Sequence, residues 1–189
     1  MVPVVERRVG VLEPLPLAIV RPGGVLVGQG EPCRGSWEVE AGVFRVSVVD
    51  ADGRALLLDL AGPGDALGGP PGSVSQVTVR AVTPARLRAT SPGRELERLP
   101  RLALDLAWRS LPERVERRLA DLAERFGRPV SGGVSIGVRL TQDDLASMVG
   151  ASREATNRAV RRLVRDGALE MPGRCRYVVR SPVRLAASS

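Results

Sequence analysis

Apolar residues recur at helical spacing twice in succession between residues 140 and 167, and Gly150 separates the two runs. The first run follows Thr141 and the second follows Ser152, and both residue types cap helix N-termini. Gly167 ends the second run as a C-terminal glycine does. The apolar positions of the second run are Ala155, Ala159, Val160, Leu163 and Val164. This pattern predicts two short helices joined by a tight turn.

The other face of the second predicted helix is polar and strongly basic. It holds Arg153, Asn157, Arg158, Arg161, Arg162 and Arg165. An arginine-rich helix face is often only solvated surface. A short helix, a glycine turn and a basic second helix also form a helix-turn-helix, whose second helix enters the major groove of DNA. This stretch alone leaves both interpretations open.

A predicted hairpin follows the two helices. The segment Met171-Pro172-Gly173-Arg174 is typical of a turn. Around it, Cys175, Tyr177 and Val179 alternate with Arg174, Arg176 and Arg180. A hairpin beside a helix-turn-helix is typical of a wing, so the DNA-binding interpretation gains weight.

The first ninety or so residues show short apolar runs separated by Gly, Pro and Asp. The predicted strands are Leu15–Val20, Val25–Val27, Trp37–Val39, Val43–Val49, Ala55–Leu60, Val74–Val82 and Ala85–Ala89. The clearest hairpin surrounds Asp50-Ala51-Asp52-Gly53, because the residues before this turn alternate strictly. Many short strands predict a small β-barrel or jelly roll.

Residues 95–126 change to helical spacing. A short piece, Glu95–Leu99, precedes Pro100, and Pro112 suits the first turn of a further helix. The apolar positions of that helix are Val115, Leu119, Leu122 and Phe126. We expect two helices here, and a loop at the Gly- and Ser-rich residues Arg128–Val138.

These patterns together predict an α+β fold in three parts. Residues 1–94 are expected to form a β-roll, residues 95–126 the connecting helices, and residues 127–189 a winged helix-turn-helix. Positive charge is concentrated in the third part. Its 11 Arg face 5 acidic residues, a net charge of +6, whereas residues 1–126 hold 17 Arg and 16 acidic residues. The basic end is the expected nucleic-acid contact.

The sequence contains no His, which excludes several kinds of active site. His is the usual general base, the commonest zinc ligand and a frequent haem ligand. Cys33 and Cys175 form no CxxC pair, so neither a disulfide framework nor an iron–sulfur cluster is indicated. We expect no enzyme activity, no metal and no cofactor. No run approaches the roughly 20 apolar residues of a membrane helix, and a reducing cytoplasm fits the two thiols.

The stretch from residue 140 to residue 158 resembles the DNA-binding domain of the CRP/FNR transcription regulators of bacteria. The shared pattern is Leu-Thr-x-x-x-Leu-Ala-x-x-Val-Gly-x-Ser-Arg-Glu-x-x-x-Arg. It is matched without a gap by Leu140, Thr141, Leu145, Ala146, Val149, Gly150, Ser152, Arg153, Glu154 and Arg158. Weaker likeness to the family's cyclic-nucleotide-binding β-roll lies at Gly30-Glu31, Gly42–Val46, Gly64–Gly68 and Val79–Ala81.

The resemblance implies a homodimer that binds double-stranded DNA at an inverted repeat of TGTGA-like half-sites. Arg153 and Arg158 would donate to guanine edges, and Glu154 would accept from a cytosine amino group. The expected phosphate contacts are Thr141, Ser152, Asn157, Arg161, Arg162, Arg174 and Arg176. RNA polymerase is a further candidate partner.

The ligand pocket departs from the family pattern. Members that bind cyclic AMP hold it with a Gly-Glu-Leu turn and an Arg-Ser pair, where this sequence has Gly68-Gly69-Pro70 and Ser75-Gln76. The acid for the ribose and the Arg for the phosphate are missing, and Arg80 lies beyond the pocket position. A buried phosphate without a cation is unfavourable. We therefore predict DNA binding without a cyclic nucleotide.

The dimerisation helix is shorter than the family pattern. Glu113–Gly127 resembles the helix after the interdomain hinge, which leaves about Arg101–Leu111 for dimerisation. The expected contact residues are Leu102, Leu106 and Trp108. An alternative function with the same architecture is a sensor whose DNA affinity is switched by an effector or by oxidation of Cys33.

Overall fold

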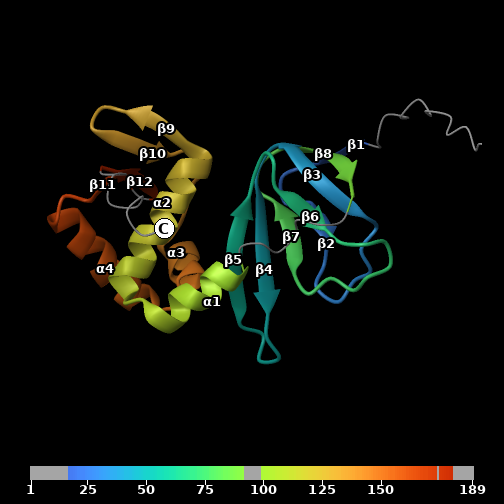
Figure 1. Ribbon diagram of the computed structural model, residues 1–189, viewed down its shortest axis with the longest axis horizontal. Helices are drawn as coiled ribbons and strands as arrows, with labels where there is room; N and C mark the ends of the chain where they lie inside the picture. The colour runs from blue at the N-terminus through green and yellow to red at the C-terminus, as the bar shows by residue number, and fades with distance from the viewer. Residues whose placement is uncertain (1–16, 92–98, 174, 181–189) are drawn as a thin grey trace, which may run out of the picture.

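Eight short strands in the N-terminal half form two four-stranded antiparallel sheets that face each other as a sandwich (Figure 1). The computed structural model describes residues 17–91, 99–173 and 175–180. One sheet has the order β1-β8-β3-β6 and the other β2-β7-β4-β5. Their bounds are β1 Leu17–Val20, β2 Val25–Val27, β3 Ser36–Ala41, β4 Phe44–Val49, β5 Ala55–Ala61, β6 Ala66–Gly68, β7 Thr78–Ala81 and β8 Ala85–Thr90.

The inward faces of the two sheets form one core. It includes Val39, Phe44, Val79 and Leu87, all of which are essentially inaccessible to solvent. Because strand side chains alternate between faces, the arginines of β8 point outward, where Arg86 pairs with Glu40 at 2.9 Å.

Two helices follow, α1 (Leu99–Trp108) and α2 (Leu111–Phe126). Ser110 precedes α2 and Pro112 lies in its first turn, a position where the missing N–H of proline costs nothing. The Glu113 side chain accepts the Ser110 N–H at 2.8 Å and completes a capping box. The buried residues of α2 are Val115, Leu119, Leu122 and Ala123.

The C-terminal half contains a four-stranded sheet and two further helices. The sheet order is β11-β12-β10-β9, and both helices precede its β11-β12 hairpin. The bounds are β9 Gly127–Val130, β10 Gly133–Ile136, α3 Gln142–Met148, α4 Arg153–Arg165, β11 Leu169–Gly173 and β12 Arg176–Val179. Helix α2 shares one core with α3, α4 and this sheet.

Strand β5 joins the two halves. Its pairing with β4 is interrupted between Val46 and Ser47, where one residue of β5 has no partner. Such a bulge reverses the alternation of side chains. Leu57 and Leu60 therefore both enter the core of the C-terminal half, although they are three residues apart. The helices consequently pack directly on the edge of the sandwich (Figure 1).

Several sequence predictions were confirmed and others were wrong. The α+β fold and the two connecting helices are confirmed. The three-residue strand β6 was missed, and Pro100 lies inside α1 rather than before it. Arg128–Val138 was expected to be a loop, but it contains the β9-β10 hairpin. Gly132 lies in the turn of this hairpin with φ of +79°, a left-handed conformation that glycine adopts readily. Most of Glu95–Leu99 lies outside the described residues, and the three-part division of the chain stays a prediction.

Candidate nucleic-acid interface

Helices α3 and α4 begin as the sequence predicted. The Thr141 hydroxyl accepts the Asp144 N–H at 3.1 Å, and the Asp144 carboxylate accepts the Thr141 N–H at 3.0 Å. The Ser152 hydroxyl accepts the Ala155 N–H at 3.2 Å and starts α4. Gly150 takes the left-handed conformation, φ +61°, between the helices. These caps fix where each helix starts, and therefore which face α4 presents.

One face of α4 is buried and the other is open to solvent. Ala159, Val160 and Leu163 are buried as predicted, and the helix packs on α2, α3 and β11. The predicted apolar stripe of α4 was wrong at two positions. Thr156, which was not assigned to the stripe, is completely buried, whereas Val164 is exposed. The buried face is therefore rotated slightly toward Thr156, because a helical stripe follows 3.6 residues per turn.

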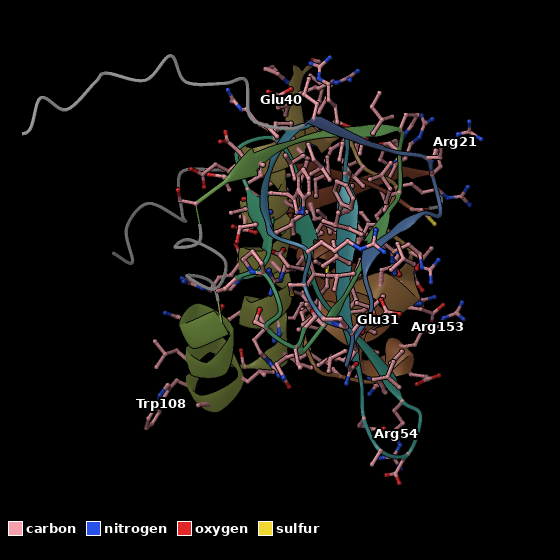
Figure 2. The ribbon with its side chains drawn as sticks, turned by 90° about the vertical axis from the view of Figure 1, so that its right-hand side faces the viewer. Arg21, Glu31, Glu40, Arg54, Trp108 and Arg153 are labelled. Carbon is pink, nitrogen blue, oxygen red and sulfur yellow. The ribbon has the colours of Figure 1, made fainter. Side chains whose placement is uncertain are left out.

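The three predicted base-reading residues lie together on the open face at the start of α4. Arg153, Glu154 and Arg158 are all exposed. A guanidinium nitrogen of Arg153 lies 3.5 Å from the Asp143 carboxylate in α3; Figure 2 shows Arg153 extending outward. Hydrogen bonds to the backbone of Glu154 itself and to Ser152 lower the pKa of the Glu154 carboxyl. Glu154 is thus ionised at neutral pH and can only accept hydrogen bonds there.

The predicted phosphate-contacting residues surround this group. Thr141 and Ser152 occupy the two helix N-termini, where backbone N–H groups and the helix dipole favour anions. Arg161, Arg162 and Arg176 are exposed. The Asn157 amide, by contrast, is half-buried and donates to Gln142 at 3.0 Å. Arg174 lies outside the described residues.

The wing is present, but its turn differs from the prediction. Strand β11 continues through Gly173, so Met171-Pro172-Gly173-Arg174 is not the turn. The chain reverses near Cys175, whose φ of +64° is unusual for a residue with a side chain. Tyr177 and Val179 face the core as expected, yet Val178 is buried too. Successive side chains of a strand point to opposite faces, so both faces of β12 are buried within the protein.

The β-roll also contributes residues that the sequence pattern did not indicate. Arg45, in β4, donates to the Asp144 carboxylate that caps α3. The Leu57 N–H in β5 donates to the Ser147 hydroxyl in α3. Burial raises the pKa of Asp144, but hydrogen bonds from Arg45 and from Thr141 outweigh this and hold the pKa below its ordinary value. No local motif could have revealed contacts between residues so far apart in sequence.

The segment expected from the sequence to correspond to a ligand pocket is bonded to the neighbouring loop. Cys33 N–H donates to Ser73 O at 2.7 Å, and Gly72 N–H donates to Cys33 O at 2.8 Å. The Ser75 hydroxyl donates to Val77 O at 2.7 Å. Arg80 is directed elsewhere, because its guanidinium donates to Gly23 O at 2.7 Å. The Cys33 side chain is buried, with 5% exposure.

Comparison with known proteins decides the family. Residues 113–188 match the Crp-like helix-turn-helix domain. The chain is 32% identical over 176 residues to the CRP-like cAMP-activated global transcriptional regulator of Mycobacterium tuberculosis, and the alignment covers 80% of this chain and 79% of that protein. The chain belongs to the CRP/FNR family of transcription regulators. Regulatory protein CysR of Synechococcus elongatus is 30% identical over 161 residues, covering 79% and 78% of the two chains.

Solved structures of similar fold agree with this assignment. A CRP/FNR-family transcriptional regulator from Thermus thermophilus superposes with a TM-score of 0.73 at 25% identity, over 91% of this chain and 97% of the other. FixK2 from Bradyrhizobium japonicum gives a TM-score of 0.75 at 21% identity, over 92% and 96%. This CRP/FNR member is accordingly a DNA-binding transcription regulator and not an enzyme. No helix among its described residues is long and apolar enough to cross a membrane.

Proposed function

We propose that this regulator binds DNA as a homodimer at an inverted repeat of TGTGA-like half-sites, without a cyclic nucleotide. The observation that carries the proposal is the open face at the start of α4, where Arg153, Glu154 and Arg158 are exposed side by side on capped, well-packed helices. Arginine matches the two acceptors of guanine, and an ionised carboxylate matches the amino group of cytosine. Residues of these types and spacing suit a short major-groove sequence.

The remaining basic residues would contact the phosphate backbone. Arg161, Arg162 and Arg176 flank the proposed base-reading residues and are exposed, and the N-termini of both helices carry the positive end of the helix dipole. Asn157 would contribute by fixing α4 to α3 through Gln142, in addition to any phosphate contact. RNA polymerase is a further proposed partner, and the site of action is the cytoplasm, where the chromosome of a bacterium lies.

The proposed dimer uses α1. Trp108 is 82% exposed and points away from the body of the molecule in Figure 2, and Leu106 is partly exposed on the same helix. Large apolar side chains on one short helix are typical of a surface that a second copy covers. Leu102, the third predicted contact, has a side chain outside the described set.

Independence from a cyclic nucleotide is supported by the pocket segment. Its hydrogen bonds are made within the protein between the Cys33 loop and the turn at Gly72-Ser73. Arg80, the candidate substitute for the phosphate-binding Arg, is bonded to Gly23. The alternative of a redox switch at Cys33 finds little support, because a buried thiol is poorly accessible to oxidants.

In vitro selection of bound DNA from a random library, with no added ligand, tests the proposal. We expect enriched sequences to contain two TGTGA-like half-sites in inverted orientation. A second selection with cyclic AMP should give the same sites at the same enrichment. Enrichment only with the nucleotide would refute effector independence, and single or direct-repeat sites would refute the symmetric dimer.

A further inference from the structure

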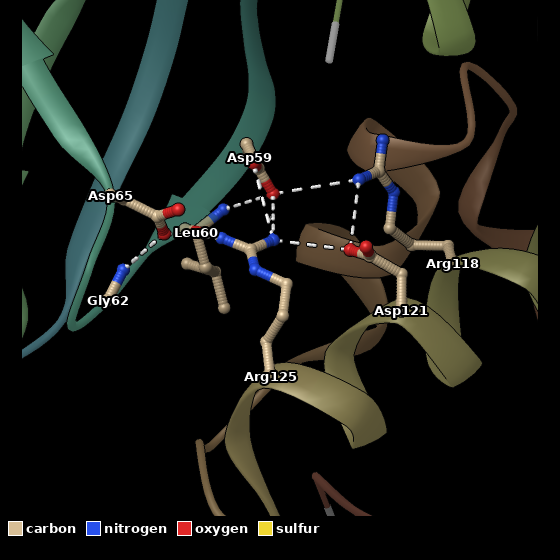
Figure 3. A network of polar contacts seen from close by, with 7 residues as sticks. All are labelled: Asp59, Leu60, Gly62, Asp65, Arg118, Asp121 and Arg125. Carbon is tan, nitrogen blue, oxygen red and sulfur yellow. Dashed lines mark hydrogen bonds and ion pairs between the residues drawn. The ribbon is translucent and has the colours of Figure 1, made fainter. Parts of the chain in front are cut away.

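Arg125, near the end of α2, reaches across to the β-roll and contacts three of its residues (Figure 3). Its guanidinium lies 3.0 Å from the Asp59 carboxylate and 2.8 Å from the Asp65 carboxylate, and it also donates to Leu60 O. Asp59 and Leu60 belong to β5, and Asp65 precedes β6. One side chain of the DNA-binding half is thus bound to two segments of the β-roll.

Further charges on α2 complete this network. Asp121 lies 3.2 Å from Arg125, and Arg118 lies 3.6 Å from Asp59. The Arg125 and Arg118 side chains are each only 14% exposed. Burial lowers the pKa of Arg125, but Asp59, Asp121 and Asp65 outweigh this and raise the pKa above its ordinary value. The buried guanidinium is therefore compensated from both halves of the protein.

The carboxylates are themselves held in place by the β-roll backbone. The Leu60 N–H donates to Asp59 at 2.8 Å, and the Gly62 N–H donates to Asp65 at 2.8 Å. Gly62 also lies against Phe126, since a Cβ at this glycine would come within 2.3 Å of the phenyl ring. Planar guanidinium groups bind fixed carboxylates with defined geometry. The contact therefore specifies an orientation as well as an attraction.

The orientation fixed by this network leaves the reading face of α4 accessible. Arg153, Glu154 and Arg158 remain exposed while Arg125 is bound. A contact that covered these residues would block DNA. The arrangement in the structure is compatible with DNA binding.

We propose that Arg125, Asp59 and Asp65 form an interdomain latch that holds the DNA-binding half on the β-roll in the orientation that binds DNA. This inference rests on the proposed binding of a two-fold site. The chain's own side chains then position the reading helix, with no ligand required. Releasing the latch leaves α4 intact and removes the charged contacts of Arg125 between the two halves, so the two recognition helices of a dimer take a wider range of relative orientations.

The test uses the full-length protein with one label on each half. Spin labels are attached to two introduced cysteines, Arg54→Cys at the tip of the β4-β5 hairpin and Arg165→Cys at the end of α4. The two native cysteines are removed by Cys33→Ser and Cys175→Asn. There are two latch variants. The first combines Asp59→Asn with Asp65→Asn, because asparagine keeps an oxygen that accepts the backbone N–H while the charge is lost. The second, Arg125→Gln, removes the positive charge that these two carboxylates bind. Glu40→Gln is the matched control, since it removes an ion pair within the β-roll.

We expect a narrow distance distribution in the labelled parent and in Glu40→Gln, and a broad one in both latch variants. If the two released heads of a dimer are correctly oriented to each other about a tenth of the time, affinity for the inverted repeat falls about tenfold, while affinity for a single half-site is unchanged. A narrow distribution in both latch variants would refute the latch. A broad distribution with the inverted-repeat affinity retained or raised would refute its role in DNA binding. If the parent bound no DNA at all, the proposed function would fail, whereas the distances would still report whether the halves are latched.

Discussion

Arg45 of the β-roll donates to the carboxylate of Asp144, which caps α3 ninety-nine positions later in the chain. The same carboxylate accepts the Thr141 N–H that begins the helix. A residue of the N-terminal half therefore takes part in the N-terminal cap of the helix-turn-helix. The start of the helix-turn-helix is therefore stabilised by a residue that lies outside it.

Replacing Asp144 by Ala should lower the free energy of unfolding by about 1–2 kcal/mol, because the capping box is lost together with the partly exposed ion pair to Arg45. Asp144→Asn should cost less, since its oxygen can still accept the Thr141 N–H. The measurement is urea denaturation followed by circular dichroism at neutral pH.

The charge of Asp144 also predicts a pH dependence. Its pKa in the folded protein lies below the ordinary value of 3.8. The ionised carboxylate therefore stabilises the fold above about pH 4, and this contribution is lost as the pH falls through the lowered pKa. The difference in unfolding free energy between the parent and Asp144→Asn should shrink below pH 4. A difference that stays constant down to pH 2 would contradict this assignment.

Tyr177 is the only tyrosine of the chain, so its ionisation can be followed by phenolate absorbance. Burial, with smaller contributions from Cys175 and Asp144, raises its pKa to about 12 from 10.0. The neutral phenol therefore stabilises the fold below pH 10, and this contribution is lost as the pH rises from 10 toward 12. We expect little phenolate at pH 10.5 in the folded protein, against a majority in urea. Equal titration in both states would place Tyr177 in solvent.

Gly62→Ala should destabilise the protein by about 1–3 kcal/mol, because the new methyl group overlaps the Phe126 ring and one of the two must shift. Gly173→Ala is the matched control, since a Cβ there meets no atom within 4 Å. Thermal unfolding of both variants checks the prediction. A loss of stability in Gly173→Ala equal to that in Gly62→Ala would point to backbone strain from any added Cβ instead of the interdomain contact.

Arg153→Ala and Glu154→Ala should each cost about 1–3 kcal/mol of binding free energy on the selected site and relax preference at one base pair. Arg161→Ala should weaken binding about equally on all sequences, because a phosphate contact carries no sequence information. Arg21→Ala, an exposed cation of the β-roll, is the control and should leave binding unchanged. Unaltered specificity in both Arg153→Ala and Glu154→Ala would show that other residues read the bases.

Trp108→Glu should dissociate the proposed dimer, because it places a charge in the centre of an apolar contact. The fold should persist, since the side chain is 82% exposed in the single chain. Ile19→Glu is a matched control, as Ile19 is an equally exposed apolar residue on the edge strand β1. Sedimentation equilibrium should show a monomer only for Trp108→Glu. Dissociation by Ile19→Glu instead would move the interface to the β-roll edge.

Local signals made the helix-turn-helix predictable from sequence. The Thr141 and Ser152 caps bond to residues three positions away, and the apolar stripe of α4 follows from helical spacing. The turn at Cys175 was misplaced because a left-handed backbone is rarely taken by a residue other than Gly or Asn. Arg45 and Arg125 could not be assigned, since their partners lie 99 and 60 or more positions away. Such pairs form only when the β-roll and the C-terminal half pack against each other.

The structure describes ten residues of α1, which rise about 15 Å. If the proposed dimer is formed by these residues alone, it buries little surface and dissociates at low protein concentration. An inverted repeat would then act as a second scaffold that brings two protomers together. In that regime promoter occupancy rises with the square of the protein concentration, and the abundance of the regulator itself becomes the signal that its promoters detect.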